Sequence, residues 1–241
     1  MINSLLSKYI VFTFSLLPIA MSLGPAIPDI IISLGGIVFL ILLYLSKNIF
    51  FLNKKYFFVF LLICIYLIFT SLISSNPLLS LESTLFYFRF GIMALVIVYL
   101  CENTNFIRYF SISLSVTLII LSMDAYIEFF LGQSILYFIF FGESSLYYKE
   151  CVECINYSGR ISGIFGDELI LGSFLIRLFP LSIALLYFNF SSNKYFNYFL
   201  TFFIVLVSSV IFLSGERTAF FMLLLFIFIS IIIISNLRKN F

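Results

Sequence analysis

The residues of this chain best suited to chemistry are arginines near the ends of long apolar stretches. Arg160 opens residues 160–168, where two glycines give the backbone freedom before the next apolar stretch. Arg217 stands in a very short turn, residues 213–219, between two such stretches. Guanidinium groups bind phosphate oxygens through paired hydrogen bonds, so several around one cavity would hold a diphosphate. For Arg217 the alternative is an arginine that snorkels to the membrane interface, with Glu216 as its neutralising neighbour. For Arg160 it is an ordinary loop with a helix cap, because Asp167 and Glu168 suit the N-terminus of the following helix.

Two further arginines are candidates because of where the apolar stretches place them. Arg177 follows Glu168 by nine positions, a helical rise of ~13 Å, which puts it near the middle of a bilayer. A charge there needs a polar cavity or a partner, so Arg177 either binds an anion or forms a structural ion pair. Arg89 lies among aromatic residues at 86–90 and either joins the anion site or snorkels to the interface.

Asp124 and Glu128 are spaced four residues apart in one apolar stretch. This spacing places both carboxylates on the same face of a helix. They are candidates for an acid–base pair or a cation site, but we favour a supporting role as partners of the arginines.

Other chemistries are excluded by composition. The chain has no His, which removes a His base, a His-ligated metal and a Ser–His–Asp triad, and no Gly-rich phosphate loop occurs. Cys151 and Cys154 form a C-x-x-C pair. The pair lacks further zinc ligands and a thioredoxin-like context, so we interpret it as structural or incidental. No metal or cofactor is predicted.

The elements that must position these residues are transmembrane helices. Of 241 residues, 63% are hydrophobic and 10% are charged, with a mean hydropathy of +1.21. Such a chain is neither a soluble enzyme, a nucleic-acid binder nor a disulfide scaffold. We predict an all-α polytopic bundle, a single domain over residues 1–241 with about eight spans. The predicted spans are 9–28, 30–46, 56–74, 85–101, 109–131, 169–190, 195–214 and 218–236.

Charge placement predicts the orientation. With a cytoplasmic N-terminus, the inner loops hold most of the basic residues, and nearly all acidic residues fall outside. The loop at 132–168 is then periplasmic, and its apolar part at 133–142 is too short to span, which predicts an interfacial or re-entrant helix. The first span is interpreted as a retained helix rather than a signal peptide. The inner basic residues are Lys8, Lys47, Lys54, Lys55, Arg108, Lys194, Arg238 and Lys239.

Three segments resemble a known family in their order and sidedness. Residues 160–167, Arg-Ile-Ser-Gly-Ile-Phe-Gly-Asp, are similar to the R-x-x-G-x-F motif of the O-antigen ligase and O-antigen polymerase family, and they precede a span that contains a proline, Pro180. Residues 213–220 resemble the family's (T/S)-x-x-R turn before an apolar helix. Residues 124–132 are similar to the stretch before its outer loop.

The resemblance implies a multi-pass glycosyltransferase of the bacterial inner membrane that uses neither metal nor nucleotide sugar. Such enzymes take a glycan from undecaprenyl diphosphate at the periplasmic face and pass it to the lipid A core or to a lipid-linked repeat, in lipopolysaccharide or surface polysaccharide synthesis. Carried over by motif, Arg160 and Arg217 would bind the diphosphate or the glycan. Arg89 and Arg177 are added from membrane placement alone.

The chain also departs from the family pattern. Asp167-Glu168-Leu169 replaces the Asn-Pro-Asn-like residues, and the family's further spans and His-bearing periplasmic loop are missing. We therefore expect an N-terminal portion of a longer protein, which binds the lipid donor without necessarily completing transfer. Two alternatives stay open, a transporter or flippase for lipid-linked sugars and a non-catalytic membrane fragment.

Overall fold

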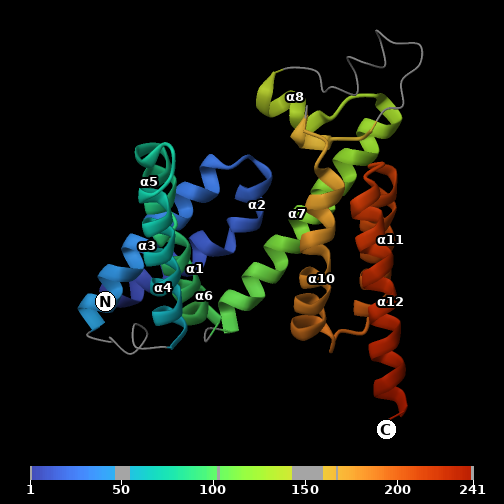
Figure 1. Ribbon diagram of the computed structural model, residues 1–241. Helices are drawn as coiled ribbons and strands as arrows, with labels where there is room; N and C mark the ends of the chain where they lie inside the picture. Colours follow the sequence, from blue (N-terminus) through green and yellow to red (C-terminus); the bar gives the residue numbers. More distant parts are fainter. Residues whose placement is uncertain (1, 47–54, 102–103, 143–159, 167, 240–241) are drawn as a thin grey trace. The chain divides into compact units, whose positions relative to one another are not determined.

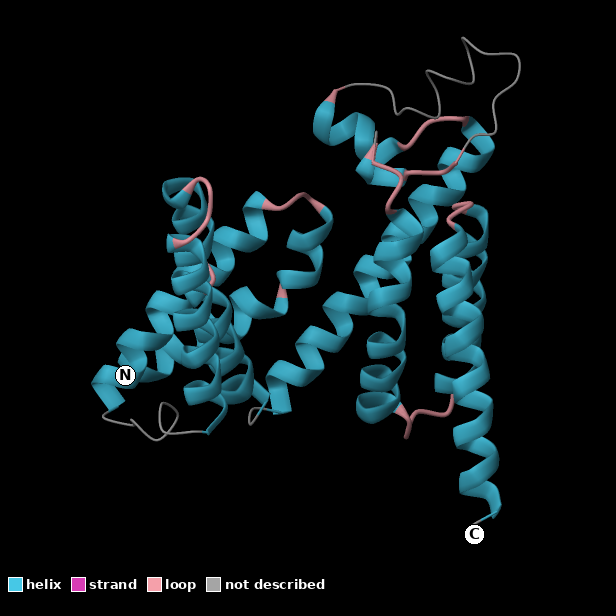
Figure 2. Cartoon of the chain, in the orientation of Figure 1, coloured by secondary structure: helices cyan, strands magenta, loops and turns pink. Residues whose placement is uncertain are grey.

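The computed structural model describes residues 2–46, 55–101, 104–142, 160–166 and 168–239, and every element among them is helical. The described chain packs as two compact units, Met1–Phe110 and Ser111–Phe241. Figure 2 shows helices joined by short loops. The two units are called unit 1 and unit 2 below, and each is described by itself.

In its described residues, unit 1 contains six helices and the start of a seventh. Phe14, Phe39, Val96 and Leu100 are almost fully buried in its core. Close packing is marked by Gly35, where an added Cβ atom would lie 2.3 Å from the ring of Phe14. The helices are α1 (Ile2–Ser15), α2 (Leu17–Ser22), α3 (Ala26–Ser46), α4 (Lys55–Leu72), α5 (Pro77–Leu85), α6 (Phe88–Cys101) and the first turns of α7 (Thr104–Leu131).

Two predicted boundaries in unit 1 are wrong. The first predicted span was to end at Pro28, but the helix ends at Ser22 and Pro28 lies in the first turn of α3. Proline fits there because the first N–H groups of a helix have no intrahelical partner. The fourth span was to begin at Leu85, but helix already begins at Pro77 and restarts at Phe88.

Unit 2 holds three long helices side by side, α10, α11 and α12, with α7 beside them (Figure 1). Leu118, Leu175, Phe203 and Val207 are fully buried in its core. Short turns join α10 to α11 and α11 to α12, so neighbouring helices run antiparallel, as predicted. The elements of unit 2 are the rest of α7, α8 (Ile135–Phe141), the 3₁₀ helix η2 (Gly163–Phe165), α10 (Leu171–Phe190), α11 (Phe196–Leu213) and α12 (Arg217–Lys239).

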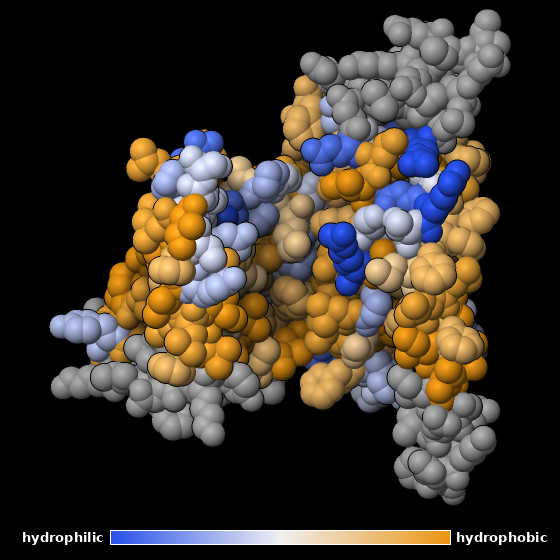
Figure 3. All heavy atoms as spheres, in the orientation of Figure 1, coloured by the Kyte–Doolittle hydropathy of each residue, from blue (hydrophilic) through white to orange (hydrophobic). Residues whose placement is uncertain are grey.

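The helices are long and apolar enough for a multi-pass membrane protein. Large side chains such as Phe130 and Phe188 are about three-quarters exposed, which hydrocarbon favours and water does not. Figure 3 shows apolar residues over much of the visible helical surface, with hydrophilic residues gathered near the end of unit 2 that carries η2. Among the described residues, six candidate spans are Leu5–Ser22, Ala26–Ser46, Pro77–Cys101, Asn105–Leu131, Leu171–Phe190 and Phe196–Leu213.

The other two predicted spans match shorter apolar helices in the described part of the chain, Phe58–Leu72 and Arg217–Ile232. The count of eight and the cytoplasmic placement of both termini therefore stay predictions. The short apolar segment at 133–142 does form a short helix, α8, which begins after Ser134 and ends at Gly142 in the left-handed conformation.

Candidate functional site

A polar cavity of about 520 Å³ lies at one end of unit 2. Two cationic side chains, Arg160 and Arg217, line it together with Leu169, Glu216 and Thr218. These residues come from the loop before α10, from the turn between α11 and α12, and from the first residues of α12. The structure therefore brings together the two arginines that the sequence motifs singled out, although they are far apart in the chain. We call this the arginine cavity.

The loop that carries Arg160 is held by Glu128, which is fully buried near the end of α7. The Glu128 carboxylate accepts hydrogen bonds from the backbone N–H groups of Ser162 (3.1 Å) and Gly163 (2.6 Å), and from the Ser162 hydroxyl (3.3 Å). Hydrogen bonds to a charged acceptor are among the stronger ones in proteins. Glu128 thus fixes the backbone only two residues beyond Arg160.

Asp124 does the same for the neighbouring segment. Its carboxylate accepts hydrogen bonds from the Ser134 hydroxyl (2.6 Å) and from the Leu136 N–H (3.0 Å), at the start of α8. Ser134 in turn accepts a hydrogen bond from the Tyr137 N–H, as an N-cap does. The two carboxylates share one helix face, as their spacing predicted. We predicted arginine partners for both, whereas the described contacts of Asp124 are with hydroxyl and backbone groups.

Two glycines give the loop its shape. Gly163 and Gly166 have backbone φ angles of +58° and +57°. Residues other than glycine adopt such positive φ angles only with steric strain. The Tyr137 ring lies directly over Gly166, where an added Cβ atom would be 1.9 Å from it. The loop is therefore clamped between α7 and α8, and this explains the need for glycines three residues apart.

The third carboxylate, Glu216, holds the other wall of the arginine cavity. It is 7% exposed and accepts hydrogen bonds from the backbone N–H groups of Gly172 (2.7 Å) and Ser173 (3.1 Å) and from the Ser173 hydroxyl. These groups lie in the first turn of α10, where the helix dipole is positive and N–H groups lack intrahelical partners. Because its negative charge is matched there, Glu216 does not need to pair with Arg217.

Arg160 and Arg217 both lie beside the α11–α12 turn that carries Glu216. The Arg160 stem lies over Gly215, whose φ is +68° and where a Cβ atom would be 3.3 Å from the Arg160 Cγ. Arg217 is the first residue of α12 and its side chain is exposed. Glu216 is occupied by the start of α10, and two arginine side chains line the cavity. Guanidinium groups suit the binding of an anion such as a phosphate.

The described residues that line the arginine cavity do not include the two arginines added from membrane placement. Arg89, in unit 1, forms an ion pair with Asp29 (3.1 Å) and lies over the rings of Phe86 and Phe90. The Arg89 guanidinium is therefore held by an acid and by aromatic rings of unit 1. Arg177 is exposed on α10, and the described residues that line the arginine cavity do not include it.

Some predicted features fall outside the described residues or were placed wrongly. Cys151, Cys154 and Asp167 lie outside the described residues. Asp167 and Glu168 were expected at the N-terminus of the following helix, but α10 begins at Leu171 and Glu168 is exposed. The acid at that helix start is Glu216, which lies more than 40 residues away in the chain. Sequence reasoning saw Glu216 only as a neighbour of Arg217, and no local signal connects it to α10.

We predict that Gly172→Ala separates α10 from the α11–α12 turn. The added Cβ atom would lie 2.3 Å from the Ser214 Oγ and 3.2 Å from a Glu216 carboxylate oxygen. Ser214 is buried and donates to the Ile211 carbonyl, so it has little room to move. We expect a loss of about 1–3 kcal/mol from overpacking, larger than the gain of about 1 kcal/mol in helix propensity. Thermal unfolding of the full chain in detergent measures the effect.

The double variant Gly172→Ala/Ser214→Ala provides the control, because it removes the hydroxyl that the new methyl group meets. Ser214→Ala alone is the reference for this double variant. In that background, Gly172→Ala should cost much less stability than it does in the unchanged chain. If the single and double variants unfold at the same temperature, the close packing at Gly172 is not what limits the site.

In comparisons with protein families, curated proteins and solved structures, no match to this chain is found. The arginine cavity and the helices that build it are therefore the basis for inferring function.

Proposed function

We propose that this protein is a membrane glycosyltransferase like the O-antigen ligases and polymerases, which takes a glycan from undecaprenyl diphosphate at the periplasmic face of a bacterial inner membrane. The observation that carries the proposal is that Arg160 and Arg217 line one cavity at the end of a bundle of membrane-length helices. A donor of this kind has its isoprenoid chain in the bilayer and its diphosphate at the membrane surface. The cavity has the charge and the position to receive that diphosphate.

The proposed reaction is displacement at the sugar. The acceptor hydroxyl attacks the anomeric carbon, forms the new glycosidic bond and loses its proton to a base, while the bond to the diphosphate breaks and undecaprenyl diphosphate leaves. Negative charge grows on the leaving diphosphate during this step. Arg160 and Arg217 stabilise that charge, and preorganised donors are most effective where charge develops. The acceptor is the lipid A core in a ligase and a lipid-linked repeat in a polymerase.

The anchoring contacts support this role because they hold the arginines in place before substrate binds. Glu128 fixes the loop of Arg160, and Glu216 fixes the turn of Arg217 against α10. Neither arginine then has to be ordered at a large entropic cost when the donor arrives. In the proposed orientation, with the N-terminus in the cytoplasm, this end of unit 2 faces the periplasm.

The experiment is donor binding and turnover by the full chain in vesicles, with radiolabelled undecaprenyl-diphosphate glycan. We expect saturable binding that undecaprenyl diphosphate displaces and undecaprenol does not. Adding an acceptor should release undecaprenyl diphosphate, and the labelled product identifies a ligase or a polymerase. Binding that undecaprenol displaces equally well would contradict a site for diphosphate.

The same assay separates the two alternatives. A transporter or flippase would move the labelled lipid across the vesicle bilayer without forming a glycosidic bond. A non-catalytic fragment would bind the donor, and no product would appear with either acceptor.

A further inference from the structure

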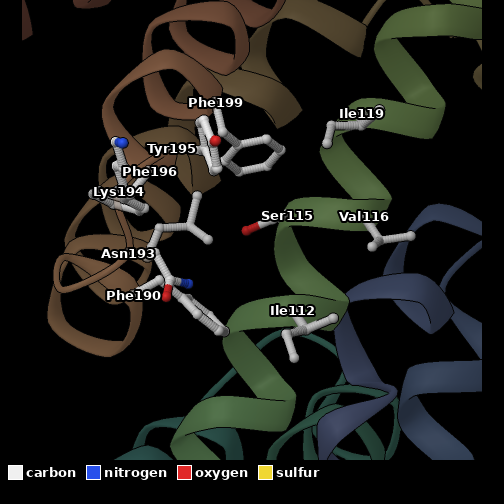
Figure 4. Close-up of a pocket in the computed structure, with 11 residues that line it drawn as sticks. Ile112, Ser115, Val116, Ile119, Phe190, Asn193, Lys194, Tyr195, Phe196 and Phe199 are labelled. Atoms are coloured by element: carbon white, nitrogen blue, oxygen red, sulfur yellow. The ribbon is translucent and has the colours of Figure 1, made fainter.

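A second cavity, of about 650 Å³, lies at the opposite end of unit 2 from the arginine cavity. Its walls are the middle of α7 and the turn that joins α10 to α11, with the helix ends on either side of that turn (Figure 4). The two cavities are at opposite ends because α10 begins beside one, at Leu171, and ends beside the other, at Phe190. We call this second space the turn cavity.

The walls of the turn cavity are mostly apolar. Side chains from α7 (Ile112, Val116 and Ile119) line it together with Phe190, Phe196 and Phe199 from α10 and α11. The hydroxyl of Ser115 also lines the cavity, but it donates to the Ser111 carbonyl (2.8 Å), so it does not require a polar ligand. A cavity of this size with apolar walls suits a hydrocarbon chain rather than a water-soluble metabolite.

One edge of the turn cavity is polar and positively charged. Asn193, Lys194 and Tyr195 follow one another in the turn, and Lys194 is the only charged residue among the described residues that line the cavity. With no acid among these lining residues, the charge favours an anionic group. The combined pattern is that of a site for an amphiphile with an apolar chain and a negative head.

The position of the turn indicates where this amphiphile comes from. Phe190 is the last residue of one membrane-length helix, and Phe196 is the first residue of the next. The turn between them therefore lies at the level where a bilayer changes from acyl chains to headgroups. Lysine and tyrosine are common at that level. Phospholipids present both parts of the required ligand there.

We propose that the turn cavity binds an anionic phospholipid, with one acyl chain between α7 and α11 and the phosphate beside Lys194. This site is separate from the arginine cavity and does not rest on the glycosyltransferase proposal. The lipid in the turn cavity comes from the bilayer leaflet opposite to the leaflet beside the arginine cavity. The lipid would fill the space between the middle of α7 and the α10–α11 turn.

Native mass spectrometry of the full chain, released from detergent with equimolar phosphatidylglycerol and phosphatidylethanolamine, tests the proposal. One lysine near an anionic headgroup favours binding by about fivefold, so phosphatidylglycerol adducts should exceed phosphatidylethanolamine adducts by about that factor. Lys194→Gln should remove the preference. Lys8→Gln, which removes an exposed cation from unit 1, should leave it unchanged.

A second pair of variants tests the apolar wall. Ile119→Trp fills the turn cavity and should remove most adducts of both lipids. Ile120→Trp changes the neighbouring residue, which is 47% exposed and does not line the cavity, and should retain them. Equal effects of the two tryptophans, or an unchanged lipid preference in Lys194→Gln, would overturn the proposal.

Two further outcomes identify a different occupant and also overturn the proposal. Undecaprenyl phosphate that displaces phosphatidylglycerol at equimolar concentration would assign the cavity to an isoprenoid carrier. A dimer without lipid adducts, which Ile119→Trp dissociates, would assign it to a second copy of the chain.

Discussion

Arg217→Ala is expected to lower the proposed glycan transfer by about 10²–10³ while leaving the chain folded and inserted. The Arg217 side chain is exposed in the arginine cavity, and the turn that carries it is held by Glu216 and Ser214. Truncation therefore removes positive charge without removing core contacts. If the guanidinium stabilises the leaving diphosphate, its loss should lower kcat by about 10²–10³. Arg217→Lys should recover only part of the activity, because an ammonium group cannot form the paired hydrogen bonds of a guanidinium.

The measurement is release of undecaprenyl diphosphate by the purified full chain, together with surface glycan in cells that depend on this protein, at matched expression. Lys8→Ala is the charge control, because Lys8 is exposed in unit 1. Normal glycan display by Arg217→Ala would count against the assignment. Arg160→Ala should have a similar effect, and the double variant should lose less than the sum, since both side chains would bind one diphosphate.

Arg177→Ala distinguishes the structural from the sequence-based view of the site. Membrane placement predicted Arg177 as a diphosphate ligand, whereas the structure leaves it exposed on α10 and outside the arginine cavity. We expect its replacement to reduce transfer far less than Arg217→Ala. An equal loss would mean that the diphosphate site extends along α10.

Glu216→Ala should be among the most destabilising substitutions in unit 2. The variant loses the acceptor of two backbone N–H groups and a hydroxyl at the start of α10. Buried donors without a partner cost about 1–3 kcal/mol each, so we expect a loss of roughly 2–4 kcal/mol because such costs are not fully additive. Glu216→Gln should be intermediate, since its amide oxygen can still accept while its amide nitrogen cannot. Thermal unfolding in detergent measures both variants.

Glu168→Ala is the matched control for Glu216→Ala. Glu168 is an exposed carboxylate in the loop before the same helix, and surface substitutions usually change stability by about 0.5 kcal/mol or less. Similar unfolding temperatures for the two alanine variants would show that Glu216 does not hold α10 to the turn. A Glu216→Gln chain that folds but binds donor weakly would show that the contact also positions Arg217.

Composition was enough to predict an all-helical membrane protein, because a chain with so few charged residues cannot form a soluble surface. Helix ends were harder to predict. The sequence places the end of a helix at Pro28, although proline is equally suited to a first turn, and only the packing of α3 decides which. The helix at Pro77–Leu85 was missed because its stability comes from contacts with α4, including a Ser71–Thr84 hydrogen bond (2.6 Å).

The sequence alone determined which residues of the site have the right chemistry. It singled out Arg160 and Arg217 by their turns and glycines, and it placed Asp124 and Glu128 on one helix face. Only the tertiary structure decided which of them meet, because the contacts that hold the cavity join residues 34 to 44 positions apart. A carboxylate that caps a distant helix leaves no periodic or local trace in the sequence, and this is why the role of Glu216 could be recognised only once α10 and the α11–α12 turn were seen together.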